Sequence, residues 1–460
     1  MASQTKVTII GGGIGGYPAA IRAARMGASV TLIEKDVLGG TCLNRGCIPT
    51  KALLHAGEVV HTIKESNIFG ITCSGYTVDF QAVANRRDTV VKQLRLGVEG
   101  LLKTKKVRII QGTAVLKNAS TVQVVETGEK LAPDRILIAS GSIPVRINID
   151  GADGPDVLDS NQVLALTELP KKIVIIGGGV IGVEFAQIFH RLGVPVTILE
   201  ALDNLIPGFD REIAQSLEKI LVDSGIEIIT RAKVGRIIHN NGKTDVCFTV
   251  ADRENRVSGE KVIMAVGRRP ELTGLDVDRI GLGHEKGALM VNPYMQTSIP
   301  HIYAAGDVTG GIMLAHMAAA ESDCAMVNAL GKPEAIRDKA IPGCIYTSPE
   351  VAGVGLTEEA AREQYDVEVG RFPFFACGKA LVINQTSGMV KIVSEKKYGE
   401  ILGVHIIGPR ATDMIAEAVL GMSMEMTAEE LAHAVHPHPT LSEAIMESAM
   451  TLCGGAVHMP

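Results

Sequence analysis

The chain has 460 residues, of which 46% are hydrophobic and 21% charged, and its formal net charge is −6. This composition predicts a globular protein of about three domains and excludes a disordered chain. The negative net charge and an aromatic content of only 3% disfavour nucleic acid as a partner, because that partner requires a concentrated basic surface and stacking platforms.

The sequence contains no run of about 20 apolar residues that would span a membrane, and its first residues lack the features of a secretory signal. We therefore expect no association with a membrane and a cytoplasmic location. In that compartment the eight cysteines are expected to be mostly free thiols, and any disulfide is expected to be catalytic.

Residues 7–35 predict a β-strand, a glycine turn, a helix and a second strand. Gly11, Gly13 and Gly16 match the pattern G-x-G-x-x-G, and Glu34 ends the second strand. Such glycines allow a tight turn, close approach of a pyrophosphate and close packing of the helix on the strand, while the acid binds a ribose hydroxyl. The glycines do not decide between FAD and NAD, and a glycine turn without a ligand is the alternative.

Two cysteines, Cys42 and Cys47, lie five residues apart. On a regular helix this spacing corresponds to a rise of about 7.5 Å, whereas a disulfide needs Cα atoms within about 7 Å. A bridge therefore requires a distorted turn, which Gly46 and Pro49 favour, and a strained disulfide is readily reduced. Lys51 and a helix N-terminus would lower a thiol pKa. From the spacing alone, a redox disulfide and two free buried thiols remain equally open.

Residues 173–201 repeat the first block, with Gly177, Gly179 and Gly182 in the glycine pattern and Glu200 at the end of the second strand. The interval from first glycine to acid is the same in both blocks. No arginine cluster follows Glu200, so a 2′-phosphate would meet a carboxylate without a cation. The second block therefore predicts a site for NAD rather than NADP.

The string CLNRGCIPTKALL (residues 42–54) resembles the redox centre of the pyridine nucleotide-disulfide oxidoreductases, and most of all that of members that oxidise dihydrolipoamide. The resemblance extends over the whole chain. Further segments that carry it are residues 112–114 (GTA), 139–142 (ASGS), 265–268 (AVGR), 302–307 (IYAAGD) and 313–316 (MLAH).

This resemblance implies that FAD occupies the first block and NAD the second. It implies that Lys51 and Glu184 form an ion pair beside the flavin, for which an ordinary surface salt bridge is the alternative. The further cofactor-binding positions that it implies are Thr113, Ala114, Ser140, Gly141, Ser142, Gly267, Asp307 and Ala315.

The C-terminal string HPHPTLSE (residues 436–443) is similar to a signature of the same family. The resemblance makes His438 the acid/base and Glu443 the carboxylate that orients it, in the active site of the partner subunit of a homodimer. A histidine titrates near neutral pH, and a carboxylate on one ring nitrogen fixes its tautomer. We interpret His433 and His436 as solvated.

The other cysteines are interpreted as packing residues, and no Cys/His spacing predicts a metal site. They are Cys73, Cys247, Cys324, Cys344, Cys377 and Cys453.

The implied fold is α/β, with two Rossmann-like domains for FAD and NAD(P) and a C-terminal α+β dimerisation domain. We expect the FAD domain to comprise residues 1–145 and 269–338, the NAD domain residues 146–268, and the interface domain residues 339–460. Strands such as residues 389–393 and helices from Thr412 onward are expected in the interface domain.

The implied reaction is the oxidation of protein-bound dihydrolipoamide by NAD+, with lipoyl domains as partners. The substrate thiolate would attack Cys42, while Cys47 would lie nearer the flavin. Two alternatives remain: an NADH-dependent reductase of another disulfide or of a metal ion, and a scaffold subunit of a multienzyme complex.

Overall fold

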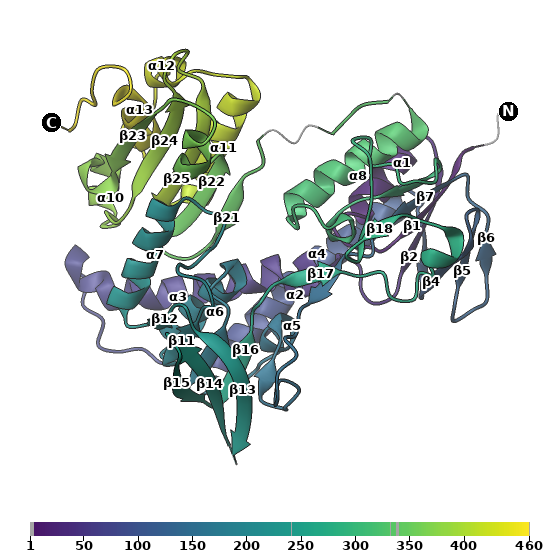
Figure 1. Cartoon of the computed structure of the whole chain (residues 1–460), viewed down its shortest axis with the longest axis horizontal. Coiled ribbons are helices and arrows are strands. Elements are labelled where there is room, and N and C mark those ends of the chain that lie inside the picture. The colour runs from purple at the N-terminus through teal and green to yellow at the C-terminus, as the bar shows by residue number, and fades with distance from the viewer. Residues whose placement is uncertain (1–3, 241, 332, 337–339, 460) are drawn as a thin grey trace.

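The computed structural model describes residues 4–240, 242–331, 333–336 and 340–459. Two five-stranded parallel sheets and one five-stranded antiparallel sheet organise the chain, which confirms the predicted α/β fold class. In Figure 1 the first parallel sheet lies at the right, the second at the lower centre, and the C-terminal sheet at the upper left.

The first parallel sheet has the order β20-β7-β1-β2-β3. Its strands are β1 (Lys6–Ile10), β2 (Ser29–Glu34), β3 (Arg108–Gln111), β7 (Arg135–Ile138) and β20 (Ile302–Ala304). The predicted first unit is formed by β1, α1 (Tyr17–Arg25) and β2, which pair in parallel. Because β20 joins β7, the chain returns to this sheet after completing the second one, and α8 (Ala315–Leu330) follows it.

The second parallel sheet has the equivalent order β12-β11-β10-β16-β9. Its strands are β9 (Val157–Leu158), β10 (Ile173–Ile176), β11 (Val196–Leu199), β12 (Glu227–Ile229) and β16 (Lys261–Met264), and α6 (Val180–Arg191) joins β10 to β11. Every residue of β10 and β11 is buried, as expected for continuous apolar strands covered on both faces.

The internal repeat extends beyond the two glycine blocks, because each parallel sheet carries a three-stranded antiparallel insertion. The insertions are β4 (Ala114–Asn118), β5 (Thr121–Val124) and β6 (Lys130–Leu131), and β13 (Lys233–Asn240), β14 (Lys243–Val250) and β15 (Arg253–Gly259). A ribbon of β8 (Ser142–Pro144) and β17 (Arg268–Pro270) joins the two sheets.

The remaining elements before the C-terminal sheet lie around the two parallel sheets. They are α2 (Gly40–Arg45), α3 (Cys47–Glu65), η1 (Ser66–Phe69), α4 (Phe80–Thr104), α5 (Ser160–Val163), α7 (Arg211–Ser224), η2 (Asp278–Ile280), β18 (His284–Glu285), β19 (Ala288–Leu289) and η3 (Asp307–Thr309). The long α3 packs on α6, so it links the first half of the chain to the second parallel sheet.

The C-terminal sheet has the order β21-β22-β25-β24-β23 and is flanked by helices. Its elements are β21 (Gly343–Ile345), β22 (Glu350–Gly355), α9 (Glu358–Arg362), β23 (Val367–Pro373), η4 (Phe374–Ala376), α10 (Gly378–Val382), β24 (Met389–Glu395), β25 (Ile401–Gly408), α11 (Ala411–Ser423), α12 (Ala428–His433) and α13 (Glu443–Met450). The predicted strand at residues 389–393 and the helix near Thr412 are confirmed as β24 and α11.

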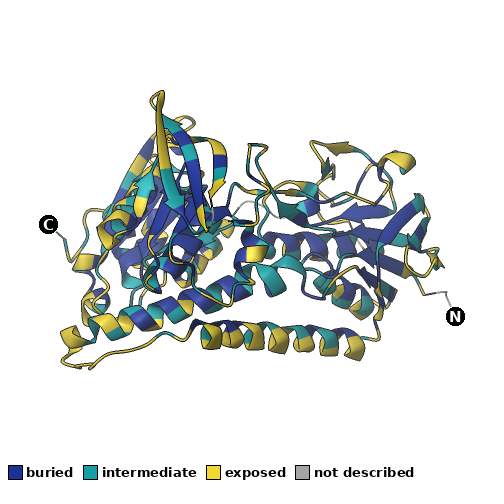
Figure 2. Cartoon of the chain, turned by 90° about the horizontal axis from the view of Figure 1, so that it is seen from below, coloured by how far each residue is buried: buried dark blue, intermediate teal, exposed yellow. Residues whose placement is uncertain are grey.

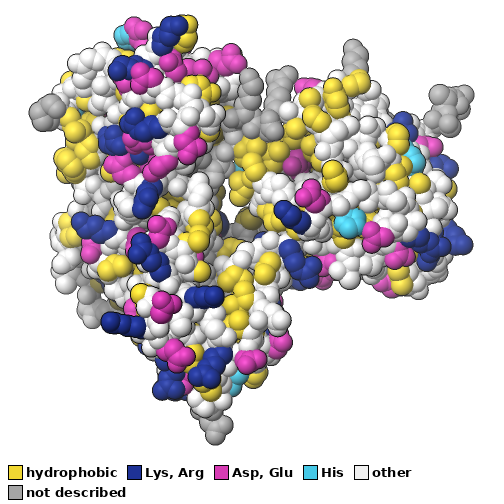
Figure 3. Space-filling model, viewed as in Figure 1, with side chains coloured by type: hydrophobic (Ala, Val, Ile, Leu, Met, Phe, Trp, Pro, Cys, Tyr) yellow, Lys and Arg dark blue, Asp and Glu magenta, His cyan; other side chains and the backbone are white. Residues whose placement is uncertain are grey.

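Buried residues concentrate in the three sheets and in the helix faces that cover them (Figure 2). Acidic and basic side chains are interspersed on the face shown in Figure 3. Among the described residues, no helix is both long and apolar enough to cross a membrane.

Candidate active site

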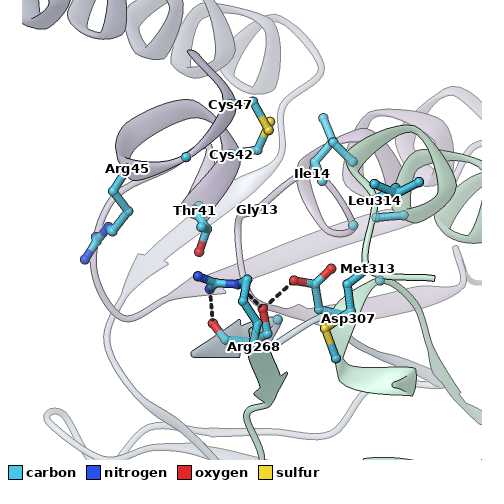
Figure 4. A pocket seen from close by; sticks show the side chains of 18 of the residues that line it. Gly13, Ile14, Thr41, Cys42, Arg45, Cys47, Arg268, Asp307, Met313 and Leu314 are labelled. Atoms are coloured by element: carbon cyan, nitrogen blue, oxygen red, sulfur yellow. Dashed lines mark hydrogen bonds between the residues drawn. The ribbon is translucent and has the colours of Figure 1, made fainter. Parts of the chain in front are cut away.

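A cavity of about 860 Å³ lies where the first glycine turn, the cysteine-bearing helices α2 and α3, the β8–β17 ribbon and the start of α8 meet (Figure 4). Most of the residues predicted for FAD and for the redox centre line it. They are Gly11, Gly13, Glu34, Cys42, Cys47, Lys51, Thr113, Ala114, Ser140, Gly141, Ser142, Glu184, Asp307 and Ala315. Segments from distant parts of the sequence therefore build one site.

The first glycine turn needs its glycines for steric reasons. Gly11 has φ +101°, and a Cβ there would overlap the carbonyl oxygen of Ala139. A Cβ at Gly16, which is not among the cavity-lining residues, would overlap the carbonyl oxygen of Gly11. Gly13 lines the cavity with bare backbone, and no side chain caps the N-terminus of α1. The turn thus presents a helix N-terminus to the cavity, an arrangement that favours phosphate.

The second glycine turn repeats this geometry. Gly177 has φ +109°, a Cβ there would overlap the carbonyl oxygen of Ala265, and a Cβ at Gly182 would overlap that of Gly177. Gly179 faces open space. Helix α6 begins at this turn, and its residues Val180, Ile181, Glu184 and Phe185 line the first cavity. The helix of the second dinucleotide motif therefore forms part of the wall of the first site.

The two acids that end the second strands hold their glycine turns in the same way. Glu34 accepts the backbone N–H of Gly12 at 2.6 Å, and Glu200 accepts that of Gly178 at 2.5 Å. Burial raises the pKa of Glu34. Since a carboxylate has about four acceptor positions, both retain capacity for ribose hydroxyls.

The two cysteines lie on either side of a break between helices. Helix α2 ends at Arg45, Gly46 has φ −147° and ψ −112°, and α3 begins at Cys47. The structure shows both cysteines as free thiols, and Figure 4 shows their side chains side by side. The break at Gly46 thus brings together two side chains that a regular helix would separate.

The two thiols differ in acidity. A hydrogen bond from the Cys42 thiol and the positive charge of Lys51 lower the pKa of Cys47 to about 7, although burial opposes them. The same hydrogen bond, followed by burial, raises the pKa of Cys42. Cys47 is also the first residue of a 19-residue helix, where a thiolate is favoured. Cys47 is therefore the better leaving thiolate of the pair.

Lys51 and Glu184 form a short ion pair. The Lys51 ammonium lies 3.0 Å from each carboxylate oxygen, and the Glu184 residue is only 3% exposed. The backbone N–H of Tyr346 donates to the same carboxylate at 2.9 Å. Although the Lys51 side chain is 31% exposed, its carboxylate partner is buried, so the pair differs from an ordinary surface salt bridge.

Asp307 ends a polar chain at the opposite wall of the cavity (Figure 4). The Ser142 hydroxyl donates to its carboxylate, and Arg268 donates to the Ser142 hydroxyl at 2.8 Å and to its carbonyl at 2.7 Å. Glu321 accepts the backbone N–H of Gly306, the residue before Asp307, at 2.6 Å, and burial raises the pKa of Glu321 to about 7. Neither Arg268, although it adjoins a motif glycine, nor Glu321 was predicted as a site residue from the sequence.

The remaining predicted cofactor positions offer backbone or small groups. The N–H and hydroxyl of Thr113 both donate to Glu126 at 2.7 Å, and the Ser140 hydroxyl donates to a backbone carbonyl at 2.6 Å. Gly141 and Gly267 have φ of +78° and +108°, and a Cβ at either would meet open space.

His438 and Glu443 lie together but outside this cavity. The Nδ1 atom of His438 is 2.8 Å from a Glu443 oxygen, and the other oxygen accepts the N–H of Thr440 at 2.7 Å. Although partial burial opposes them, these hydrogen bonds lower the pKa of Glu443. The His438 side chain is 77% exposed and is not among the residues that line the cavity of its own chain.

Two interpretations of single residues are wrong. His436 is not solvated, because its side chain is 6% exposed and its Nε2 atom lies 2.6 Å from Glu417. Cys73 and Cys453 are exposed and so are not packing residues.

Cys344 lies near the redox pair, although no motif in the sequence indicated this. It lines the same cavity as the redox pair. Burial raises the pKa of Cys344 to about 11, so the thiol stays protonated at neutral pH.

The residues around the cavity fit FAD. One end offers the uncapped glycine turn and the Glu34 carboxylate, as a dinucleotide requires, and the other offers the thiols and the apolar side chains of Ile14 and Leu314. Within the described ranges, no group of three or more His, Cys, Asp or Glu side chains is arranged to hold a metal ion.

Comparison with known proteins agrees with this geometry. Family models described as "Pyridine nucleotide-disulphide oxidoreductase" and its dimerisation domain match residues 5–322 and 341–449. Curated relatives named dihydrolipoyl dehydrogenase are 43% identical in Bacillus subtilis (98% of this chain, 99% of the relative) and 42% identical in Thermus scotoductus (98% of each).

Similar solved structures include two bacterial proteins. The HOCl-induced flavoprotein disulfide reductase RclA from Escherichia coli has a TM-score of 0.87 and 32% identity over 96% of this chain and 98% of its own. LpdA from Mycobacterium tuberculosis has a TM-score of 0.90 and 26% identity over 97% of this chain and 99% of its own. The chain belongs to the pyridine nucleotide-disulphide oxidoreductases, a family of FAD- and NAD-dependent enzymes whose C-terminal domain forms homodimers.

Proposed function

We propose that the protein is a dihydrolipoyl dehydrogenase that oxidises protein-bound dihydrolipoamide with NAD+. The observation that carries the proposal is the pair Cys42 and Cys47, which meet at a helix break inside the cavity of the first glycine turn. Full-length relatives with this name support the choice of substrate.

The chain's own residues perform the thiol chemistry. In the oxidised protein Cys42 and Cys47 form a disulfide, and His438 of the second subunit takes the proton of a substrate thiol while Glu443 holds its Nδ1 atom. The substrate thiolate attacks the Cys42 sulfur, the S–S bond breaks, and Cys47 leaves as a thiolate. The second substrate thiol then attacks the mixed disulfide, Cys42 leaves and takes up the proton of that thiol, and the disulfide of lipoamide closes.

The electrostatics favour this direction of cleavage. A leaving thiol departs faster when its pKa is low, and the pKa of Cys47 is lowered to about 7. FAD bound in the cavity supplies a two-electron carrier between the dithiol and a nicotinamide. The glycine turn, Glu34 and Asp307 would hold FAD, and the turn at Gly177 would hold NAD.

The proposed assembly is a homodimer in which each subunit completes the other's site. The exposed His438–Glu443 pair supports this arrangement, because it lies outside its own chain's cavity. We further propose lipoyl domains of a 2-oxoacid dehydrogenase or glycine cleavage complex as partners. A cytoplasmic location, the preference of Glu200 for NAD and the four domain ranges stay predictions.

The test is a direct comparison of substrates with the purified holoenzyme. We expect rapid NADH formation from NAD+ and dihydrolipoamide, and little NADH oxidation with glutathione disulfide. Cys47→Ser should abolish lipoamide turnover while retaining bound flavin. Near-full turnover by that variant would falsify the proposal.

A second candidate is an NADH-dependent reductase of another disulfide or of a metal ion. It is favoured by the likeness to RclA, whose Cu(II) complex has also been solved and has a TM-score of 0.88 and 31% identity over 97% of this chain. NADH oxidation that depends on Cu(II), without lipoamide turnover, would select this candidate.

A further inference from the structure

Tyr346, which follows β21, touches both members of the Lys51–Glu184 pair. The Lys51 ammonium lies 4.3 Å from the centre of its aromatic ring. Its backbone N–H donates to the Glu184 carboxylate at 2.9 Å, and the same oxygen accepts the ammonium at 3.0 Å. The ring and the peptide of one residue therefore fix the cation and the anion together.

The backbone that carries Tyr346 is itself fastened to α6. The Gln187 amide donates to the carbonyl of Ser348 at 2.9 Å and accepts its N–H at 2.6 Å. Because Glu184 and Gln187 are three residues apart, they lie on one face of α6. Their bonds to residues 346–348 fix the C-terminal sheet against the helix that walls the cavity.

We propose that Tyr346 is a positioning residue that holds the Lys51 ammonium in the redox cavity and thereby sets how readily Cys47 ionises. This inference rests on the proposed function in one respect, the role of Cys47 as leaving thiolate. An ammonium over an aromatic face is attracted by the electron-rich face of the ring, which biases the position of a flexible lysine.

The charges around Cys47 make its ionisation sensitive to that position. The groups that face it are Cys42 from α2, Lys51 from α3, Glu184 from α6, Arg268 from β17 and Tyr346 itself, which follows β21. Lys51 favours the thiolate and Glu184 opposes it. If the ring is lost, the ammonium is held by Glu184 alone, so its charge is compensated and the Cys47 thiolate is less favoured.

The experiment measures the rate of iodoacetamide alkylation of Cys47 against pH in the reduced holoprotein, with peptide mass analysis to locate the label. Tyr346→Leu should decrease the thiolate fraction near pH 6 about threefold, equivalent to a rise of about half a pH unit in the midpoint. Tyr346→Phe keeps the ring and the backbone bond, so it should restore the wild-type midpoint.

A matched control is available on the surface. Lys397 stacks on Tyr398 at 4.5 Å, and Tyr398 is 71% exposed. Tyr398→Leu removes the same kind of contact without approaching the cavity, so it should leave the midpoint unchanged.

Two results would overturn the inference: an unchanged midpoint in Tyr346→Leu, or an equal shift in Tyr346→Phe. If Tyr346→Leu does not fold, Tyr346→Met serves as the variant without a ring. Because alkylation requires no lipoamide, the result is independent of the substrate. A wild-type protein without dihydrolipoamide turnover would refute the proposed function and leave the alkylation result intact.

Discussion

Replacing Lys391 by methionine should destabilise the protein strongly, because this ammonium lies between three carboxylates. Its Nζ atom is 2.9 Å from Asp210, 3.0 Å from Glu212 and 2.8 Å from Glu358. The side chains of Lys391 and Asp210 are only 2% and 0% exposed. The pair joins β24 of the C-terminal sheet to Asp210, the N-cap residue of α7, and α7 packs on β12 of the second parallel sheet.

The expected cost follows from the charges left behind. Arg371 still pairs with Glu212 at 2.9 Å and with Glu358 at 2.8 Å, but Asp210 loses its ammonium. Breaking a buried pair by removing one partner costs about 3–5 kcal/mol. We therefore expect the thermal midpoint to fall by at least about 5 °C.

The loss should depend on pH in a defined direction. Although burial opposes it, hydrogen bonding to Lys391 lowers the pKa of Glu358 to about 2. The wild-type network therefore contributes fully above the ordinary glutamate pKa of about 4.3, and its contribution is lost as the pH falls toward 2. In Lys391→Met the Glu358 carboxylate loses this hydrogen bond, so its pKa should rise toward the ordinary value. The difference in thermal midpoint between the wild type and the variant should therefore narrow below about pH 5.

Thermal denaturation followed by circular dichroism at several pH values measures this effect. Lys396→Met is the control, because Lys396 is 55% exposed and lies 3.9 Å from Glu368, and an exposed pair contributes about 0–1 kcal/mol. A midpoint of Lys391→Met equal to that of the control, or a difference that grows as the pH falls, would refute the reasoning.

Three further predictions concern the site. Gly182→Ala should weaken NADH binding in fluorescence titration, because its Cβ would overlap the carbonyl oxygen of Gly177 in the second turn; unchanged NADH binding would contradict this. In the reduced protein, iodoacetamide should label Cys47 with a midpoint near pH 7 while Cys344, with its pKa raised to about 11, stays unlabelled at neutral pH; equal labelling would be the contrary result. Glu443→Gln should decrease turnover with dihydrolipoamide at least about tenfold, because the His438 Nδ1 atom then loses the carboxylate that orients the ring; unaltered turnover would argue against this role.

Those parts of the fold and site whose requirements are local could be predicted from the sequence. Positions 11 and 177 require glycine, because φ is positive there and a Cβ would overlap a neighbouring backbone carbonyl. The two turns are therefore recognisable in the sequence. The cysteine spacing indicated only that a bridge would require a distorted turn, which Gly46 favours, and the helices are interrupted at Gly46. The family resemblance supplied Asp307 and the pair of Lys51 with Glu184.

Contacts between segments that are distant in the sequence could not be predicted from local sequence patterns. Tyr346 and Cys344 reach the redox cavity only because the C-terminal sheet packs on α6, and neither belongs to a motif. His436 lies in a proline-rich string that suggested a solvated side chain, whereas its partner Glu417 lies on α11, 19 residues earlier. Such pairs depend on tertiary packing, which spacing does not encode.

Anaerobic titration of the holoprotein with NADH, followed in the visible spectrum, tests the central claim most directly. The account predicts that two electrons per site produce a long-wavelength absorbance band, because the Cys47 thiolate then lies against oxidised flavin. Cys47→Ser should lack this band. Purified protein without a flavin spectrum, or an identical titration in wild type and Cys47→Ser, would contradict the account.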